Sequence, residues 1–198
     1  MIRFGSIFFF IILLVSCGKD RRANSIISSI PNEAEFSDSS ESRASDISKA
    51  LEIQIPMSNE ELKNWIPVKV GQMEQRKLIV GHKQGMEMSG AISTYQEIGQ
   101  EGKQVSMEVL DGAGATAAVM LSSISQKLNL DYEEQLPSGY SKIYEREGLR
   151  IWEKSNSEEH HVEIEFVLKE RFHFIFKGYQ IQMDEFWAFV KEVIEEMK

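Results

Sequence analysis

The chain has 198 residues, a length that predicts one folded domain after any export signal and linker are set aside. Acidic side chains outnumber basic ones by 31 to 22, and the resulting net charge of −9 disfavours both nucleic-acid binding and electrostatic adhesion to anionic lipid. The single cysteine excludes an internal disulfide, and a domain of about 140 residues buries enough apolar surface to fold without one.

The N-terminus has the pattern of an export signal. Arg3 provides a basic start, residues 4–15 form an apolar run, and Ser16 is a small residue directly before Cys17. The run is too short to span a bilayer, because a transmembrane helix needs about 20 apolar residues. We therefore expect residues 1–16 to be a cleaved signal peptide.

Leu14-Val15-Ser16-Cys17 resembles the lipobox of bacterial lipoproteins. The resemblance implies transfer of diacylglycerol to the Cys17 thiol, cleavage before Cys17, and acylation of the new amino group with a fatty acid such as palmitate. Two or three acyl chains on one residue hold a protein at a membrane without a spanning helix. By analogy with lipoprotein sorting in enteric bacteria, Gly18 favours the outer over the inner membrane. The alternatives are an uncleaved signal anchor and an ordinary secretory peptide.

Residues 17–50 are expected to be the lipidated cysteine and a flexible linker, because Ser, Asn, Asp, Glu and Arg dominate their composition. A short unanchored helix fits residues 46–51. The globular domain is predicted to span residues 51–198. Its first helix follows a capping box formed by Ser58 and Glu61 and ends near Trp65, ahead of Pro67.

Alternation of apolar and polar residues predicts most of the remaining chain to be strands. Strands are expected over 77–82, 89–98, 103–110, 140–145, 149–154, 160–169 and 171–179. Glu101-Gly102 is a suitable tight connection between the second and third of these, which predicts a hairpin. Val162, Ile164 and Phe166 alternate with Glu163 and Glu165, a pattern typical of a sheet with one dry and one solvated face.

Two longer segments have helical periodicity. Residues 116–129 place apolar side chains on one helical face, and residues 183–197 form a stronger apolar stripe. Strands joined by hairpins, interrupted by one helix and closed by another, predict an α+β fold with a largely antiparallel sheet whose dry face is covered by helices. The order of elements is loosely similar to that of PsbP-type domains, in topology alone.

Asp111 to Ala117 contains G-x-G-x-x-A between a predicted strand and a predicted helix. This spacing is typical of a dinucleotide-binding turn, where free N–H groups at the helix start hold a pyrophosphate. No second strand ends in an acidic ribose ligand, because Asp131 has the right offset but lies in a predicted loop. We therefore interpret the glycines as a tight strand-to-helix turn, with a small-anion site as an alternative, and predict no cofactor.

Catalytic and metal sites are not predicted. His160 and His161 are neighbours on a predicted strand and point to opposite faces, while His82 and His173 are isolated in sequence. The sequence has no G-x-S-x-G elbow and no H-E-x-x-H helix. Four aromatic residues are candidates for lining an apolar pocket, but ordinary packing is the favoured interpretation: Tyr95, Trp152, Tyr179 and Trp187.

These observations predict a non-catalytic lipoprotein of the cell envelope, held outside the cytoplasm by the lipid on Cys17. Its expected partners are the membrane and an envelope protein or small apolar ligand, and nucleic acid is not among them. One alternative is a lipid-anchored carrier or chaperone for apolar envelope molecules. Another is a hydrolytic enzyme whose catalytic residues are scattered in sequence.

Overall fold

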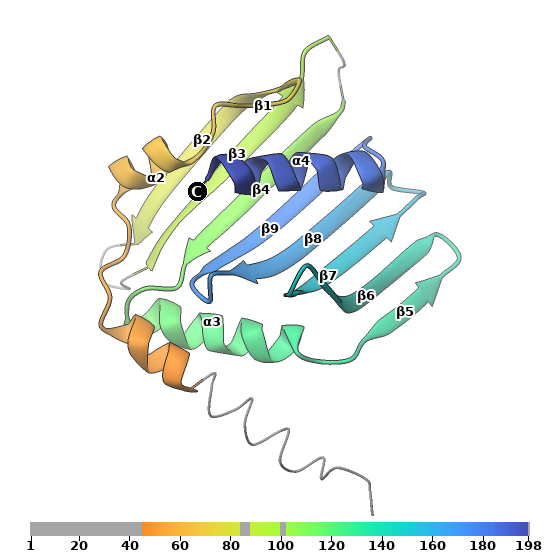
Figure 1. Cartoon of the computed structure of the whole chain (residues 1–198). Helices are drawn as coiled ribbons and strands as arrows, with labels where there is room; N and C mark the ends of the chain where they lie inside the picture. The colour runs from red at the N-terminus through yellow and green to blue at the C-terminus, as the bar shows by residue number, and fades with distance from the viewer. Residues whose placement is uncertain (1–44, 84–87, 100–101, 198) are drawn as a thin grey trace, which may run out of the picture.

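The chain folds as an α+β domain around one antiparallel sheet, in a computed structural model that describes residues 45–83, 88–99 and 102–197 (Figure 1). The described strands are β1 (Lys69–Val70), β2 (Met73–Lys83), β3 (Met88–Glu97), β4 (Gln104–Asp111), β5 (Glu133–Leu136), β6 (Gly139–Arg146), β7 (Leu149–Asn156), β8 (His161–Leu168) and β9 (Phe172–Tyr179). The helices are residues 45–52, α2 (Asn59–Trp65), α3 (Ala115–Leu128) and α4 (Met183–Glu196). The coarse fold prediction is confirmed, while the predicted signal peptide lies outside the described residues.

The strands are ordered β1-β2-β3-β4-β9-β8-β7-β6-β5, and each pairs antiparallel with its neighbours. The predicted hairpin is confirmed by the pairing of β3 with β4, although Glu101 itself lies outside the described residues. The pairing of β4 with β9 joins strands β1–β4 to strands β5–β9 near the centre of the sheet. The short edge strands β1 and β5 were not predicted.

One face of the sheet carries the main hydrophobic core. Met107 on β4, Ile164 on β8 and Phe176 on β9 point to this face and are fully buried. The apolar stripe of α4 covers them, and the Phe189 ring packs edge-on against Phe176 with 6.5 Å between ring centroids. Each buried side chain of this size contributes about 1.5–3 kcal/mol, so this face supplies most of the hydrophobic stabilisation. We call it the first face.

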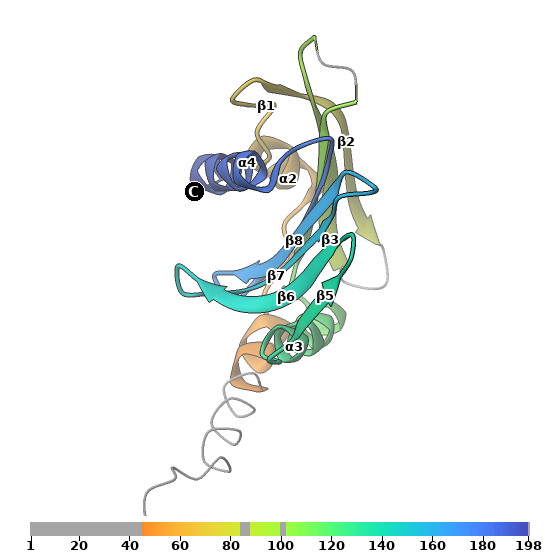
Figure 2. The same cartoon turned by 90° about the vertical axis from the view of Figure 1, so that its right-hand side faces the viewer.

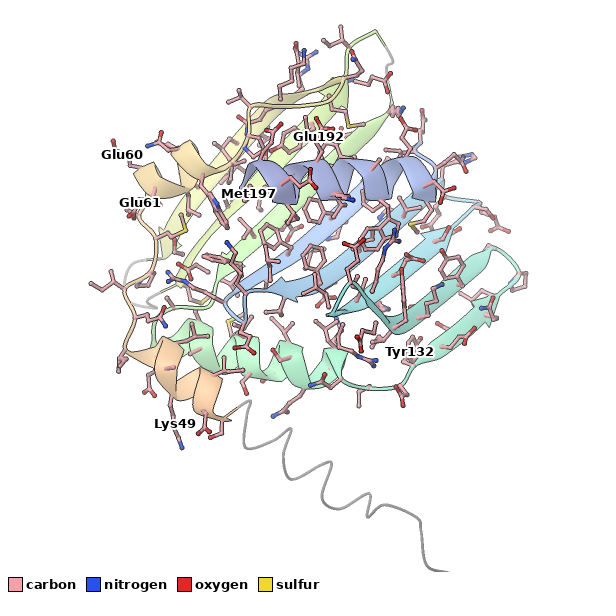
Figure 3. All side chains as sticks on the ribbon, in the orientation of Figure 1. Lys49, Glu60, Glu61, Tyr132, Glu192 and Met197 are labelled. Carbon is pink, nitrogen blue, oxygen red and sulfur yellow. The ribbon has the colours of Figure 1, made fainter. Side chains whose placement is uncertain are left out.

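Two hydrogen bonds join α4 to the start of the domain. The Trp65 indole at the end of α2 donates to the Met197 carbonyl at 2.6 Å, and the Gly71 N–H donates to the Glu192 carboxylate at 2.8 Å. The predicted capping box of α2 is confirmed, because the Ser58 and Glu61 side chains each accept from the other's backbone N–H. Figure 3 shows Glu61 at the start of α2, with Glu192 and Met197 along α4.

The opposite face, which we call the second face, is partly covered by the other two helices. Leu51 of helix 45–52 packs with Ala118 and Leu121 of α3 and with Val167 of β8. Val167 points away from the first face, because neighbouring residues of a strand alternate. Figure 2 shows α2 and α4 together on one side of the sheet and α3 apart from them. Helices therefore cover parts of both faces, and the prediction of a simply solvated second face is wrong.

The folded part also extends further toward the N-terminus than predicted. Residues 45–50 were expected to belong to the linker, with an unanchored helix at 46–51. In the structure these residues are helical, and Ile47 and Leu51 pack against α3 and β8. The sequence signal was weak because this helix is short and its anchor is a tertiary contact. Within the described residues, no helix combines the length and apolarity needed to cross a bilayer.

Candidate binding surface

The glycine turn at Asp111 to Ala117 leads from β4 into α3. The N–H groups of Gly112 and Gly114 donate to the backbone carbonyls of Arg171 and Leu51, at 2.8 and 3.0 Å. A Cβ at Gly112 would lie 2.7 Å from the Arg171 carbonyl oxygen, closer than real Cβ atoms approach. These two N–H groups of the turn are therefore used within the fold, and close packing explains Gly112.

Asp111, at the end of β4, is a fully buried carboxylate with a structural role. Arg171 binds it through two hydrogen bonds of 2.7 and 2.8 Å, and the N–H groups of Met57 and Ala113 add two more at 2.9 and 3.0 Å. Burial alone would raise the pKa of Asp111, but these donors hold the pKa below its usual value. The cluster fixes the segment that connects helix 45–52 to α2.

Glu153 on β7 is the centre of a second buried cluster, on the first face. Its carboxylate accepts from the hydroxyls of Tyr140 and Tyr144 and from the Trp187 indole, each at 2.7 Å, and Lys142 lies 3.6 Å away. Burial opposes the charge, yet these donors lower the pKa of Glu153. Burial and the neighbouring carboxylate raise the pKa of Tyr144 to about 12. The cluster is complete without a ligand and attaches α4 to β6 and β7.

Glu165 on β8 forms a third buried cluster, on the second face. The Lys127 ammonium lies 2.6 Å from its carboxylate and the His173 ring nitrogen 3.0 Å away, while Lys127 also lies over the Trp152 ring. Burial opposes the charge, but hydrogen bonds from both partners lower the pKa of Glu165. The sequence pattern grouped Glu165 with solvated side chains because it could not show that α3 covers this position.

A hydrolase needs a nucleophile beside such a pair. Among the hydrogen bonds of the described residues, none joins a serine or threonine hydroxyl to His173, whose imidazole contacts the Glu165 carboxylate. The Glu165–His173 pair thus lacks the third member of a hydroxyl-based catalytic arrangement. The geometry supports a role in holding α3 on the sheet.

The structure separates the remaining predicted candidates. Tyr95 lies in the first-face core and Trp187 on α4, whereas Trp152 lies on the second face and Tyr179 is exposed at the end of β9. Because they lie on opposite faces of the sheet, the four do not line one pocket. In the part of the chain that the structure describes, no group of three or more His, Cys, Asp or Glu is placed to hold a metal ion.

His160 and His161 were both predicted to lie on a strand, and the prediction is wrong for His160. His160 lies in the turn before β8 with a φ of 49°, and only His161 belongs to the strand. The His161 ring lies 4.9 Å from the Tyr179 ring, and burial lowers the pKa of His161. The side chain of His82 and the whole of Cys17 lie outside the described residues.

A surface that sequence analysis did not identify lies on the uncovered part of the second face. Ile79 on β2 is paired with Ile92 on β3, and Ile175 on β9 lies two strands further along the same row. Ile79 and Ile92 are 45% and 41% exposed, and neither hydrophobic core cluster includes any of the three. The next row begins with Gly81 opposite Gly90.

Together these residues form an open depression of about 280 Å³, which we call the apolar concavity. Leu110 and His173 also line it, as does Glu108, whose carboxylate lies 3.3 Å from the Lys177 ammonium. The concavity lies on the face of β2, β3 and β4 opposite to the core that α4 covers, and Figure 1 views the sheet from the α4 side. Alternation along each strand could have indicated this face, but not that the helices leave it uncovered.

Comparison with known proteins adds little to these observations. Neither a protein-family model nor a curated protein matches the sequence. One similar solved structure is a GTP binding regulator from Thermotoga maritima, with 12% sequence identity, a TM-score of 0.35, and coverage of 72% of this chain and 93% of that chain. A similarity of this size supports no inference about the activity of this chain.

Proposed function

We propose that this protein is a lipid-anchored, non-catalytic binding domain of a bacterial cell envelope, which takes an apolar side chain of a protein partner into the apolar concavity. The observation that carries the binding role is the exposure of Ile79 and Ile92 on a concave sheet face outside both core clusters. Grouped apolar side chains left in water are characteristic of interaction sites, whereas scattered ones are not.

The open shape of the concavity favours a side chain of a partner over a whole ligand. Sites that enclose a small molecule usually have volumes of about 300–1,000 Å³ and bury most of its surface. The apolar concavity is open and holds about 280 Å³, so it accommodates one large side chain of a partner. Such an anchor, inserted at the centre of an interface, commonly dominates its binding energy. A carrier of apolar molecules would need a more enclosed space.

The lipid anchor at the membrane is inferred from the sequence. Leu14-Val15-Ser16-Cys17 resembles a lipobox, and we propose lipidation of Cys17 with removal of residues 1–16. The polar residues up to 44 then serve as a linker between the membrane and the folded part. Gly18 favours placement at the outer membrane where the cell has one.

Labelling in the native host tests the anchor. Cells grown with labelled palmitate should incorporate it into the wild-type protein and not into the Cys17→Ala variant. Globomycin, which blocks the lipoprotein signal peptidase, should make a larger precursor accumulate. Mass spectrometry that finds an unmodified Cys17 thiol, or an intact leader, would contradict the anchor.

Crosslinking in intact cells tests the binding surface. A photo-reactive amino acid at position 92 should yield a discrete crosslinked species whose second component is an envelope protein. The matched control is position 136, because Leu136 is similarly exposed but lies on the distant edge strand β5. Equal crosslinking from both positions would show that exposure alone determines the products, and would refute the assignment.

A further inference from the structure

The outer side of β2 is largely unpaired in the structure. β2 has 11 residues, but β1 pairs only with Met73 and Glu74, and one further hydrogen bond joins the Gln75 N–H to the Val68 carbonyl. From Lys77 onward, no strand of the described residues pairs with this side of β2, which Figure 1 shows at the edge of the sheet. Such an edge offers a row of N–H and C=O groups to another extended chain.

Gly81 on this strand has no explanation within the fold. A Cβ added at Gly81 would meet nothing within 4 Å, and its φ is not positive. A glycine inside a strand costs about 0.5–1 kcal/mol relative to alanine. Gly90, its partner on β3, differs because a Cβ there would lie 2.7 Å from the Val109 carbonyl oxygen. A glycine inside a strand often marks a bulge, a bend, or a place where a ligand or another backbone approaches closely, and the register of β2 with β3 has no bulge at Gly81.

The apolar concavity reaches this same edge. Gly81 and Ile79 belong to the edge strand and line the concavity, so a chain paired with β2 would place alternate side chains beside it. A large aromatic ring on the added strand, opposite Gly81, would cover the glycine and fill the depression. Aromatic side chains are known to compensate for glycines at sheet edges in this way.

Charge further restricts the added strand. Lys77 points to the same face as Ile79 and Gly81, because these residues alternate along β2. No carboxylate of the described residues forms an ion pair with its ammonium, in a chain whose net charge is −9. Opposite charges on directly facing strand positions stabilise pairing. An acidic residue opposite Lys77 would therefore favour binding.

We propose that β2 binds an extended segment of a partner protein as an additional antiparallel strand, with an aromatic side chain opposite Gly81 and an acidic one opposite Lys77. The segment supplies main-chain hydrogen bonds along the edge, and the concavity selects its aromatic side chain. This inference rests on the proposed function of the concavity as the binding surface.

The probe is the capped peptide Ser-Phe-Thr-Val-Thr-Glu-Ser. In antiparallel register its phenylalanine, valine and glutamate lie opposite Gly81, Ile79 and Lys77. In hydrogen exchange of the full chain, this peptide should slow by at least about ten-fold those amides of residues 77–81 whose N–H groups point away from β3. The amides of Glu133–Leu136, on the other sheet edge, should not change. Replacing phenylalanine with alanine, or glutamate with lysine, should weaken binding.

Two methylated analogues isolate the main-chain contribution. One carries N-methyl groups on phenylalanine, valine and glutamate, and the other carries them on the two threonines. On an added strand, alternate N–H groups point toward β2 and away from it. Exactly one analogue should therefore lose affinity, by at least about ten-fold, because several hydrogen bonds are removed. Loss with both analogues, or with neither, overturns strand addition.

Further outcomes separate the other occupants and the two proposals. Protection of these amides in the protein without peptide would overturn the inference. Protection that depends on protein concentration would indicate a second copy of this chain, and protection that does not would indicate residues of the same chain. Absence of peptide binding also overturns the inference. If Ile92→Thr weakens binding while the analogues behave alike, only strand addition fails. If the peptide binds and Ile92→Thr does not weaken its binding, the concavity is not the binding surface, and both the proposed function and the inference that rests on it fail.

Discussion

Two parts of the sheet differ in how completely their side chains are satisfied by contacts within the fold. On the first face, Tyr140 and Tyr144 surround Glu153, and every donor of this group has a partner. On the second face, Ile79 and Ile92 remain half exposed beside an unexplained glycine. The cluster with acid–base side chains is thus structural, and the plain apolar surface is the better candidate for binding.

The largest expected effect is on the complete cluster. Glu153→Ala leaves two tyrosine hydroxyls and an indole N–H without their acceptor, so the free energy of unfolding should fall by about 3 kcal/mol. Urea denaturation measures this. Glu133→Ala, an exposed acidic residue on neighbouring β5, should change it by less than about 0.5 kcal/mol. Similar losses from both variants would mean that Glu153 has no special structural role.

The same cluster should also respond to acid. The pKa of Glu153 is lower in the folded protein than its ordinary value of 4.5, so its contribution to stability is present above 4.5 and is lost as the pH falls through the folded pKa. Glu153→Gln should therefore flatten the fall in unfolding free energy below about pH 5. Denaturation curves over this range measure it, and Ile92→Thr serves as the control. If the free energy of unfolding of Glu153→Gln falls below pH 5 as steeply as that of the wild type, protonation of Glu153 does not cause the loss of stability in acid.

A smaller effect of opposite sign is expected at the incomplete surface. Gly81→Val adds a side chain where nothing lies within 4 Å, so the free energy of unfolding should rise by about 0.5–1 kcal/mol while partner binding is lost. Thermal unfolding and crosslinking from position 92 measure the two effects. Destabilisation by valine would indicate that the depression is already filled.

The smallest expected effect is that of Ile92→Thr. Threonine keeps the β-branched shape at a position that is already 41% exposed, so stability should change by less than about 1 kcal/mol. Crosslinking to the partner, measured here from a photo-reactive amino acid at position 79, should nevertheless decrease. Leu136→Thr, the matched change on β5, should leave crosslinking unchanged. A comparable decrease in both variants would show that the partner does not recognise the concavity.

Local signals in the sequence predicted much of the fold. The Ser58–Glu61 capping box, the alternation in β4 and the apolar stripe of α4 depend on neighbouring residues, and the structure contains all three. The edge strand Glu133–Leu136 was missed because all of its residues are exposed and it has no apolar alternation. Strand alternation identified a second face but not its partial covering by α3.

The candidate surface is defined by open space beside particular residues, and sequence patterns do not show which residues have open space beside them. Gly81 and Gly90 look alike in sequence, but the space beyond Gly81 is open whereas Val109 closely approaches Gly90. Glu163 and Glu165 also occupy equivalent positions in the alternating pattern, yet Glu165 is buried and forms an ion pair with Lys127 of α3. Tertiary placement decides both cases.

Crosslinking from position 92 in intact cells, compared between the wild-type protein and Gly81→Val, tests the central claim most directly. The account predicts a discrete species with one envelope protein in the wild type and its loss in Gly81→Val, while both proteins accumulate to the same level with labelled palmitate on Cys17. The same crosslinked species at undiminished yield in Gly81→Val would contradict it.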